Sequence, residues 1–163
     1  MLLRYNHWPK ALLHGRIYKG ITIMDTVTKQ YIETVQVSDI PWHRLTTSYG
    51  RGTDFPNQFD VLWKMDSIEA VDAAGEDIAL NIEHQSTLWH ATPFAMIFLL
   101  RIFKRAQEES AQNKVAHYLA EQLVELFAVI AECIRDGLLL EHADPLPCFD
   151  DMLNEEYLWS EEY

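Results

Sequence analysis

The segment that most constrains the fold is an almost continuous apolar run behind a helix-start pattern. Thr92 precedes Pro93, the arrangement of an N-cap residue followed by the first residue of a helix. From Phe94 to Leu100 the chain is uncharged and nearly all apolar, and Phe103 continues the pattern. A helix that is apolar nearly all round has to be covered by other elements. The sequence therefore predicts an assembly of helices with this one in its middle.

Other segments with helical patterns are expected to form the helices that pack around this apolar helix. Each has apolar residues near helical spacing or is bounded by a cap residue, a proline or a glycine. Asp54 and Pro56 form one such start, and Gly137 ends the longest apolar stripe, on which His117 and Cys133 are expected to pack in the core. The expected helices are 38–50, with Pro41 in its first turn, 53–65, 66–85 and 113–137, with a short final helix over 149–159.

The first 38 residues have a different composition. The segments 16–24 and 30–37 are rich in Ile, Val, Thr and Tyr, and the second alternates apolar and polar residues, so a β-hairpin is expected. The length of 163 residues favours one domain. We expect a β ribbon over 1–38 that caps a helical core over 39–137, with an acidic segment over 138–163 at the other end.

Two histidines, His84 and His90, stand at the corner before the apolar helix. A metal site would need a third ligand at recognisable spacing, and a nucleophile paired with Ser86 would need a strand–turn–helix elbow; neither pattern is present. We expect the preceding helix to end near Gln85, with His84 either bonding to its last carbonyls or interacting favourably with the helix dipole. The corner is therefore interpreted as architectural, and no catalytic residue, metal or cofactor is predicted.

The overall charge limits the partners. The net charge is −12, with 25 acidic and 13 basic residues, which argues against nucleic acid, because contacts to phosphates need Lys and Arg. The densest basic group, Arg101, Lys104 and Arg105, is expected to be a solvated helix end. No apolar run approaches the ~20 residues of a membrane span, and no secretory leader is recognised. Two cysteines are too few for a disulfide framework, so we expect a cytoplasmic protein.

The carboxylates concentrate at the C-terminal end. From residue 138 onward there are eight carboxylates and no Lys or Arg. A solvated tail is one interpretation, and a surface that attracts a basic protein is the other. Interleaved aromatic residues, among them Phe149, suit the second, since aromatic anchors and a polar rim are typical of protein interfaces. The expected partner-binding residues are Asp144, Asp150, Asp151, Glu155, Glu156, Tyr157, Trp159, Glu161, Glu162 and Tyr163.

A resemblance adds to this interpretation. Residues 40–105 resemble a bacterial family of HEAT-like helical-repeat proteins with the pattern Trp-x-x-Leu-x-x-Ala-Tyr-Gly, then Asp-x-Pro, then His-Gln-Gly-Thr before an apolar helix. Ser48 and Ser86 replace the family's alanine and glycine, and Pro93 comes earlier than usual. The resemblance implies a mainly α fold of HEAT/ARM-like stacked helical hairpins. The matching positions are Trp42, Leu45, Tyr49, Gly50, Asp54, Pro56, His84, Gln85, Thr87, Ala91, Thr92, Phe94 and Leu99.

Some members of that family resemble immunity proteins encoded beside bacterial toxins. Together with the acidic surface, this favours a non-catalytic protein that binds and neutralises a basic toxin domain such as a nuclease, for example in contact-dependent growth inhibition. An alternative is a general protein–protein adaptor. A HEAT-like DNA-repair glycosylase is the least favoured alternative, because the basic residues needed to hold a nucleic acid are scattered.

Overall fold

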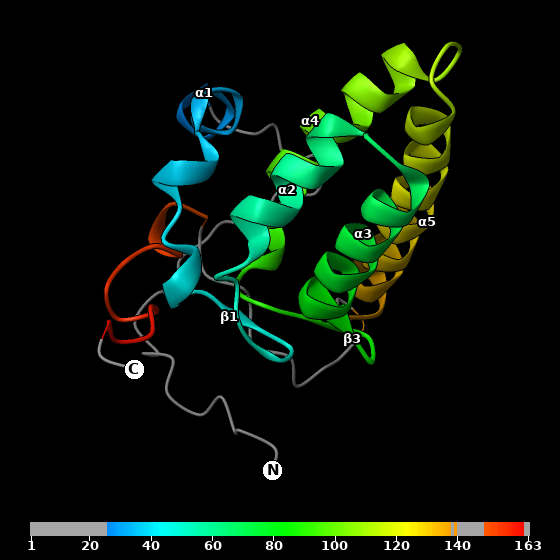
Figure 1. Cartoon of the computed structure of the whole chain (residues 1–163). Helices are drawn as coiled ribbons and strands as arrows, with labels where there is room; N and C mark the ends of the chain where they lie inside the picture. The colour runs from blue at the N-terminus through cyan, green and yellow to red at the C-terminus, as the bar shows by residue number, and fades with distance from the viewer. Residues whose placement is uncertain (1–25, 138, 140–148, 162–163) are drawn as a thin grey trace.

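The computed structural model describes residues 26–137, 139 and 149–161. Within these residues the structure is mainly helical, with two small antiparallel β-hairpins (Figure 1). None of the described helices is long and apolar enough to cross a lipid bilayer. The elements are α1 (Thr26–Thr34), the 3-10 turns η2 (Val37–Asp39) and η3 (Trp42–Arg44), β1 (Thr46–Thr47), β2 (Gly50–Arg51), α2 (Phe55–Lys64), α3 (Ile68–Ile82), β3 (Glu83–His84), β4 (Thr87–Leu88), α4 (Thr92–Glu109), α5 (Lys114–Gly137) and the 3-10 turn η4 (Phe149–Asp151).

The four longer helices form two hairpins that lie against each other. Helix α2 packs on α3 and α4 packs on α5, while α2 also contacts α4 and α3 also contacts α5. Like helices of the two hairpins run in the same direction, so that α3 and α5 descend side by side in Figure 1. Ser67 caps α3 by accepting a hydrogen bond from the backbone of Ala70, and Asn113 caps α5 in the same way through Val115.

Helix α4 lies in the centre of the core, as the sequence predicts. Its side chains Phe94, Ala95 and Leu99 have at most 1% of their surface exposed. One turn further along, Phe98 joins an aromatic cluster in which Trp42 contacts three phenylalanine rings at centroid distances of 5.4–5.8 Å. This cluster joins η3, α2 and α4, so the burial of α4 determines where the elements before it pack.

The corner before α4 is a β-hairpin and not a simple loop. Helix α3 ends at Ile82, earlier than predicted, and β3 pairs with β4 across a two-residue turn. Both turn residues, Gln85 and Ser86, are left-handed, with φ of 52° and 62°, as the tightest hairpin turns require. His84 lies two residues beyond the end of α3, and its ring lies edge-on to the ring of Tyr49 in the β1–β2 hairpin.

Thr92 holds this corner to α3. Its side chain is 3% exposed, and its hydroxyl donates a 2.6 Å hydrogen bond to the carbonyl of Ile82 at the helix end. The same hydroxyl accepts a 2.9 Å hydrogen bond from the backbone N–H of Trp89. Ala91 occupies the N-cap position that was expected for Thr92, because the threonine side chain is directed back to α3 instead of to its own helix.

The predicted β ribbon is wrong where the structure describes it. Residues 30–37 were expected to form a strand, but α1 covers Thr26–Thr34, and the predicted first strand over 16–24 lies outside the described residues. The apolar positions Tyr31, Ile32 and Val35 satisfy helical spacing as well as rough alternation, and Val35 is buried on the core. A segment this short fits both periods, so packing decides between them.

The helix predicted over 38–50 is also wrong. Two 3-10 turns and the hairpin β1–β2 occupy this stretch. Trp42 and Leu45 are buried three residues apart, which one 3-10 turn achieves, and Gly50 has a φ of +143° that favours glycine in the hairpin. The hairpin is then fixed to the core by hydrogen bonds from Ala91 to Thr46 and from Ser48 to Asn81.

Helix α5 follows its predicted apolar stripe from Lys114 to Gly137. Leu119, Leu123 and Ile130 are buried, and Cys133 packs beside them as expected. The expectation for His117 is wrong: its side chain is exposed and lies 3.5 Å from the Glu121 carboxylate on the outer side of the helix. The predicted final helix over 149–159 is confined to the 3-10 turn η4, followed by turns.

The replacement Thr92→Val tests the role of this hydroxyl. The two side chains have nearly the same shape, so the substitution removes the two buried hydrogen bonds of the hydroxyl, to the Ile82 carbonyl and from the Trp89 N–H. We expect the free energy of unfolding to fall by about 1–3 kcal/mol in urea titrations. The matched substitution of an exposed threonine, Thr87→Val, should change it by less than about 0.5 kcal/mol. Equal effects of the two substitutions would contradict this role of Thr92.

Candidate functional site

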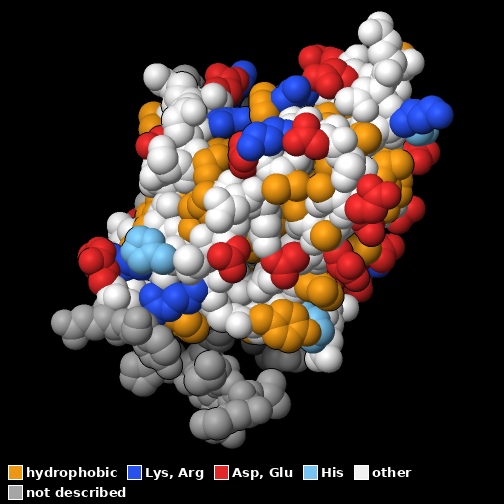
Figure 2. Space-filling model, in the orientation of Figure 1, with side chains coloured by type: hydrophobic (Ala, Val, Ile, Leu, Met, Phe, Trp, Pro, Cys, Tyr) orange, Lys and Arg blue, Asp and Glu red, His pale blue; other side chains and the backbone are white. Residues whose placement is uncertain are grey.

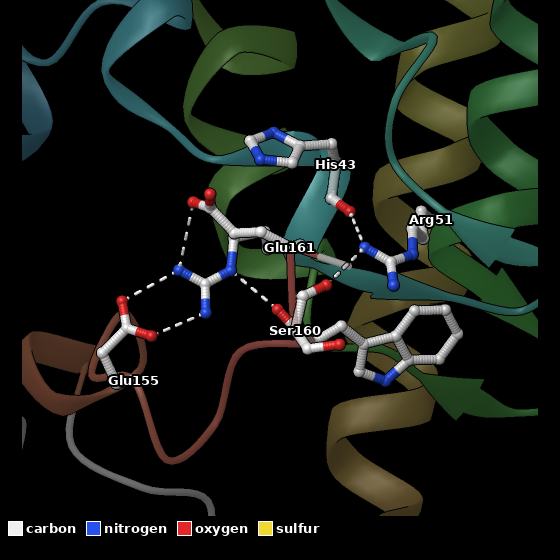
Figure 3. Close-up of polar contacts among 7 residues, drawn as sticks. His43, Arg51, Glu155, Ser160 and Glu161 are labelled. Atoms are coloured by element: carbon white, nitrogen blue, oxygen red, sulfur yellow. Dashed lines mark hydrogen bonds and ion pairs between the residues drawn. The ribbon is translucent and has the colours of Figure 1, made fainter. Parts of the chain in front are cut away.

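The C-terminal segment (residues 149–161) carries most of the partner-binding residues expected from the sequence. Asp144, Glu162 and Tyr163 lie outside the described residues, and only the backbone of Asp150 is described. The rest of the segment does not extend freely from the body of the protein. It lies along η3 and the hairpin β1–β2, where two basic residues, the arginine pair (Arg44 and Arg51), hold it (Figure 3).

Arg44 makes the closest contacts with this segment. Its guanidinium binds both oxygens of the Glu155 carboxylate, at 2.8 and 2.6 Å, and its Nε donates a 2.7 Å hydrogen bond to the carbonyl of Trp159. The backbone N–H of Trp159 returns a 3.0 Å hydrogen bond to the carbonyl of Arg44, and Glu161 lies 3.7 Å from the guanidinium. A bidentate, charge-assisted pair of this kind fixes both direction and register.

Arg51 holds the end of the segment. Its Nη1 donates to the carbonyls of His43, at 2.7 Å, and Ser160, at 3.2 Å. The guanidinium carbon also lies 4.7 Å from the centroid of the Trp159 ring, in cation–π geometry. Figure 3 shows the Arg51 guanidinium between the backbone carbonyls of His43 and Ser160. Trp159 therefore has an intramolecular contact in addition to any role toward a partner.

Apolar contacts hold the other end of the segment. Met152 is buried, and its carbonyl lies 2.6 Å from Nε2 of His90. Phe149 contacts the rings of Tyr31 and Phe94 at centroid distances of 5.6 and 5.3 Å. Burial lowers the pKa of His90, while the Met152 carbonyl acts in the opposite direction. The second corner histidine thus joins the C-terminal segment to α4, a contact that the sequence pattern alone did not indicate.

The contacts of Arg44 change the electrostatics of the predicted acidic tail. Hydrogen bonds from Arg44 lower the pKa of Glu155, so this carboxylate is ionised and paired within the molecule. Glu161 lies near the same cation. Of the other carboxylates predicted here, Glu156 is exposed, and Asp151 is within 3.4 Å of the Asn154 side-chain amide. Part of the negative charge expected at this end is therefore already compensated.

The structure reveals a second group of carboxylates on the paired helices α3 and α5. Between residues 65 and 100 the sequence has six carboxylates and no Lys or Arg. Among the described residues, no Lys or Arg lies within 4 Å of the carboxylates that α3 exposes. Figure 2 shows acidic side chains gathered where α3 and α5 lie, with hydrophobic side chains among them. We define the acidic face by its exposed carboxylates Glu69, Asp72, Glu76, Glu121, Glu125 and Glu132.

Tyr118 marks where the two helices of the acidic face meet. Its hydroxyl, on α5, donates a hydrogen bond to the Asp72 carboxylate on α3. This bond, together with burial and the charges of Asp72, Glu125 and Glu76, raises the pKa of Tyr118. The hydrogen bond joins the row of carboxylates on α3 to α5 at this point. The acidic face is therefore continuous across the α3–α5 contact.

Large apolar side chains are exposed on the same two helices. Ile68 and Leu80 on α3 are 41% and 45% exposed, and Val124 and Val129 on α5 are 53% and 42% exposed. Apolar residues beside unpaired charges are typical of protein interfaces, where the apolar residues supply burial and the charges supply orientation. The absence of Lys and Arg from residues 65–100 was the sequence pattern that could have identified this face.

Two of the three basic residues expected to form a solvated helix end have structural contacts instead, whereas Lys104 is exposed. Arg101 donates to the carbonyls of Ile32 and Val35, at 2.6 and 2.7 Å, and so binds the end of α1 to α4. Arg105 stacks on the Trp63 ring and donates to its carbonyl at 2.7 Å. Both arginines lie within α4, where long side chains can reach over neighbouring helices.

His84 and His90, which were considered above for a metal or a nucleophile site, contact different parts of the structure. The ring of His84 contacts Tyr49, whereas that of His90 contacts Phe94 and the Met152 carbonyl. Within residues 26–137, 139 and 149–161, no three His, Cys, Asp or Glu side chains are placed to hold a metal ion. Burial, and then the charge of Glu83, raise the pKa of the Cys133 thiol, which favours its protonated form.

The chain was compared with family models, curated proteins and solved structures, and no significant match was found in any of the three.

The neighbouring glutamates Glu155 and Glu156 provide a matched test of the Arg44 contact. We expect Glu155→Gln to accelerate amide hydrogen exchange over residues 149–161 at pH 7, because it removes the charge that Arg44 binds. Glu156→Gln removes the same charge from an exposed side chain and should leave exchange unchanged. Identical behaviour of the two variants would contradict the proposed attachment.

The same contact predicts a dependence on pH. The pKa of Glu155 is lowered in the folded protein, so its contribution to stability is complete above its unfolded pKa of about 4.3 and is lost as the pH falls through the lowered value. Thermal unfolding between pH 7 and pH 3 should therefore show a smaller acid-induced loss of stability for Glu155→Gln than for the wild-type chain. The Glu156→Gln variant should follow the wild-type curve.

Proposed function

We propose that this protein is a non-catalytic, cytoplasmic immunity protein that binds and neutralises a basic toxin domain, such as a nuclease. The observation that carries the proposal is the acidic face. Its carboxylates are exposed on α3 and α5, lie across a shared helix contact and are interspersed with exposed apolar side chains. A nuclease needs basic residues to grip the phosphates of its substrate, and an acidic protein surface can occupy those residues.

We further propose that the two helical hairpins are stacked repeats of the HEAT-like kind. Three observations support this. The hairpins α2–α3 and α4–α5 contact each other through like helices, α2 with α4 and α3 with α5. Two residues of the shared sequence pattern, Tyr49 and His84, contact each other. Ser86 stands where the family has glycine, and its φ of 62° is a conformation that glycine adopts without strain.

The balance between paired and unpaired charge favours the acidic face over the C-terminal segment as the main contact with the toxin. Glu155 and Glu161 already lie beside Arg44, so a basic partner would have to compete with that arginine. Hydrogen bonds to Asp72 and Asp77 come from neutral groups of Tyr118 and Gln58, which leave the charge uncompensated. An uncompensated charge attracts a cation more strongly than a paired one.

The experiment uses the C-terminal domain of the protein encoded immediately upstream of this chain's gene. We expect the purified domain to form a complex with the wild-type protein and to lose its toxic activity in that complex. The dissociation constant should rise steeply between 50 mM and 500 mM salt, because screening weakens charge attraction. The triple variant Glu69→Lys, Glu76→Lys and Glu125→Lys should weaken the complex at least about tenfold.

The matched control changes the net charge by the same amount away from the acidic face. Glu33 on α1, Glu108 on α4 and Glu156 in the C-terminal segment are exposed, and the variant with lysine at all three should bind within about threefold of wild type. Equal weakening by the two triple variants would refute the acidic face as the contact. Failure of the wild-type chain to bind or inhibit the domain would refute the immunity function itself.

A further inference from the structure

We infer that the arginine pair is a peptide-binding site, independent of the acidic face, and that it accepts an acidic, tryptophan-bearing segment of another protein. In this structure the chain's own residues 155–161 occupy the site, and they define the chemistry of its ligand. The ligand needs a carboxylate and a tryptophan four residues later, with a turn between them like the one closed here by the hydrogen bond from Leu158 N–H to the Glu155 carbonyl. The C-terminal segment then acts as an internal competitor that a partner segment displaces.

The contacts recognise general features of a peptide. Arg44 binds the Glu155 carboxylate at two points and exchanges two hydrogen bonds with the backbone of Trp159. Arg51 binds the carbonyl of Ser160 and the face of the Trp159 ring. Only the carboxylate and the ring depend on sequence, since the other partners are backbone groups that any peptide carries. A main-chain contact with alternate side-chain anchors is a recurring mode of peptide recognition.

The two partners of the ion pair differ in exposure. The side chain of Arg44 is 10% exposed, whereas those of Glu155 and Glu161 are 80% and 75% exposed. Water and solutes therefore reach the pair from the carboxylate side, which is the side that a competing carboxylate would approach. A competing carboxylate can therefore exchange with Glu155 or Glu161 without opening the core around Arg44.

The hairpin side of the site is held in position independently of the segment. Arg51 lies on β2 and donates a 2.7 Å hydrogen bond to the carbonyl of His43, which belongs to η3. The backbone of Arg44 continues directly into the core through the buried Leu45. Displacing the segment therefore leaves both arginines anchored at their backbones, and a preorganised site loses less entropy when a new ligand binds.

The covalent link between the C-terminal segment and its site sets the concentration that a competing peptide needs to displace the segment. A segment joined to its own site has an effective concentration on the order of millimolar, so a peptide with the same contacts competes poorly at micromolar concentration. Weakening the internal segment lowers that threshold without altering the arginine pair. A double variant, Glu155→Gln with Glu161→Gln, should therefore bind an external copy of the wild-type segment that the wild-type chain largely excludes.

The test measures fluorescence anisotropy of a labelled synthetic peptide, FDDMLNEEYLWSEEY, which copies residues 149–163. The probe is added to the full-length wild-type chain and to the full-length double variant. We expect at least about tenfold tighter binding to the variant, because its own segment no longer supplies the two carboxylates. A peptide with glutamine at the positions of Glu155 and Glu161 should bind at least about tenfold more weakly than the wild-type peptide.

Two further measurements keep the test decisive. Adding Arg44→Lys to the double variant keeps the charge but removes the bidentate geometry, and should abolish the gain in peptide binding while leaving the far-ultraviolet circular dichroism unchanged. The comparison of the two peptides does not depend on how any Arg44 variant folds. Equal binding of both peptides, or equal binding to the wild-type chain and the double variant, would overturn the inference. Concentration-dependent dimerisation of the wild-type chain would assign the site to exchange between copies and would also overturn it.

Discussion

The burial of α4 is the constraint on which the rest of the structure depends. Its apolar residues face several directions, so that α2, α5, the aromatic cluster around Trp42 and the C-terminal segment all pack against it. Removing apolar surface from water stabilises such an arrangement by about 25 cal/mol per Å². This stabilisation depends on the area buried and does not by itself fix how the elements are oriented. Direction comes from specific polar contacts: Thr92 joins α4 to the end of α3, Arg101 joins it to the end of α1, and His90 lies against the carbonyl of Met152.

The sequence could predict the long helices, because their apolar residues recur with one period over many residues. Helices α2, α3, α4 and α5 each extend over ten or more residues and carry caps, proline or an apolar stripe, and the structure places them close to the predicted bounds. The predictions that are wrong concern short segments. Residues 30–37 satisfy two periods, and residues 38–50 contain a proline, aromatic residues and a glycine that suit several turn types. Burial of Trp42 and Val35 decided both cases, and burial is a property of the whole fold.

The negative charge of the candidate site could be predicted from the sequence, but its position on the fold could not. Counting charges along the chain emphasises the last residues, because no Lys or Arg follows residue 138. The count misses Arg44, which lies more than 100 residues earlier and meets Glu155 only in three dimensions. The absence of Lys and Arg from residues 65–100 marks the α3 part of the acidic face, but the α5 carboxylates join it only through the packing of α3 on α5. Linear charge density is therefore a poor guide to surface potential when the chain folds back on itself.

The placement of the cations makes the charge distribution over the described residues uneven. Every Lys and Arg among them lies outside α3, and α5 carries Lys114 at its start and Arg135, which is paired with Asp136, at its end. Helix α3 therefore carries four carboxylates and no cation, which makes the field on its side of the described structure negative. In the field of a cationic macromolecule, such an uneven charge distribution produces a torque that turns the α3 side toward the cation while the two are still separated by water. Orientation is then partly complete before contact, which raises the fraction of collisions that are productive.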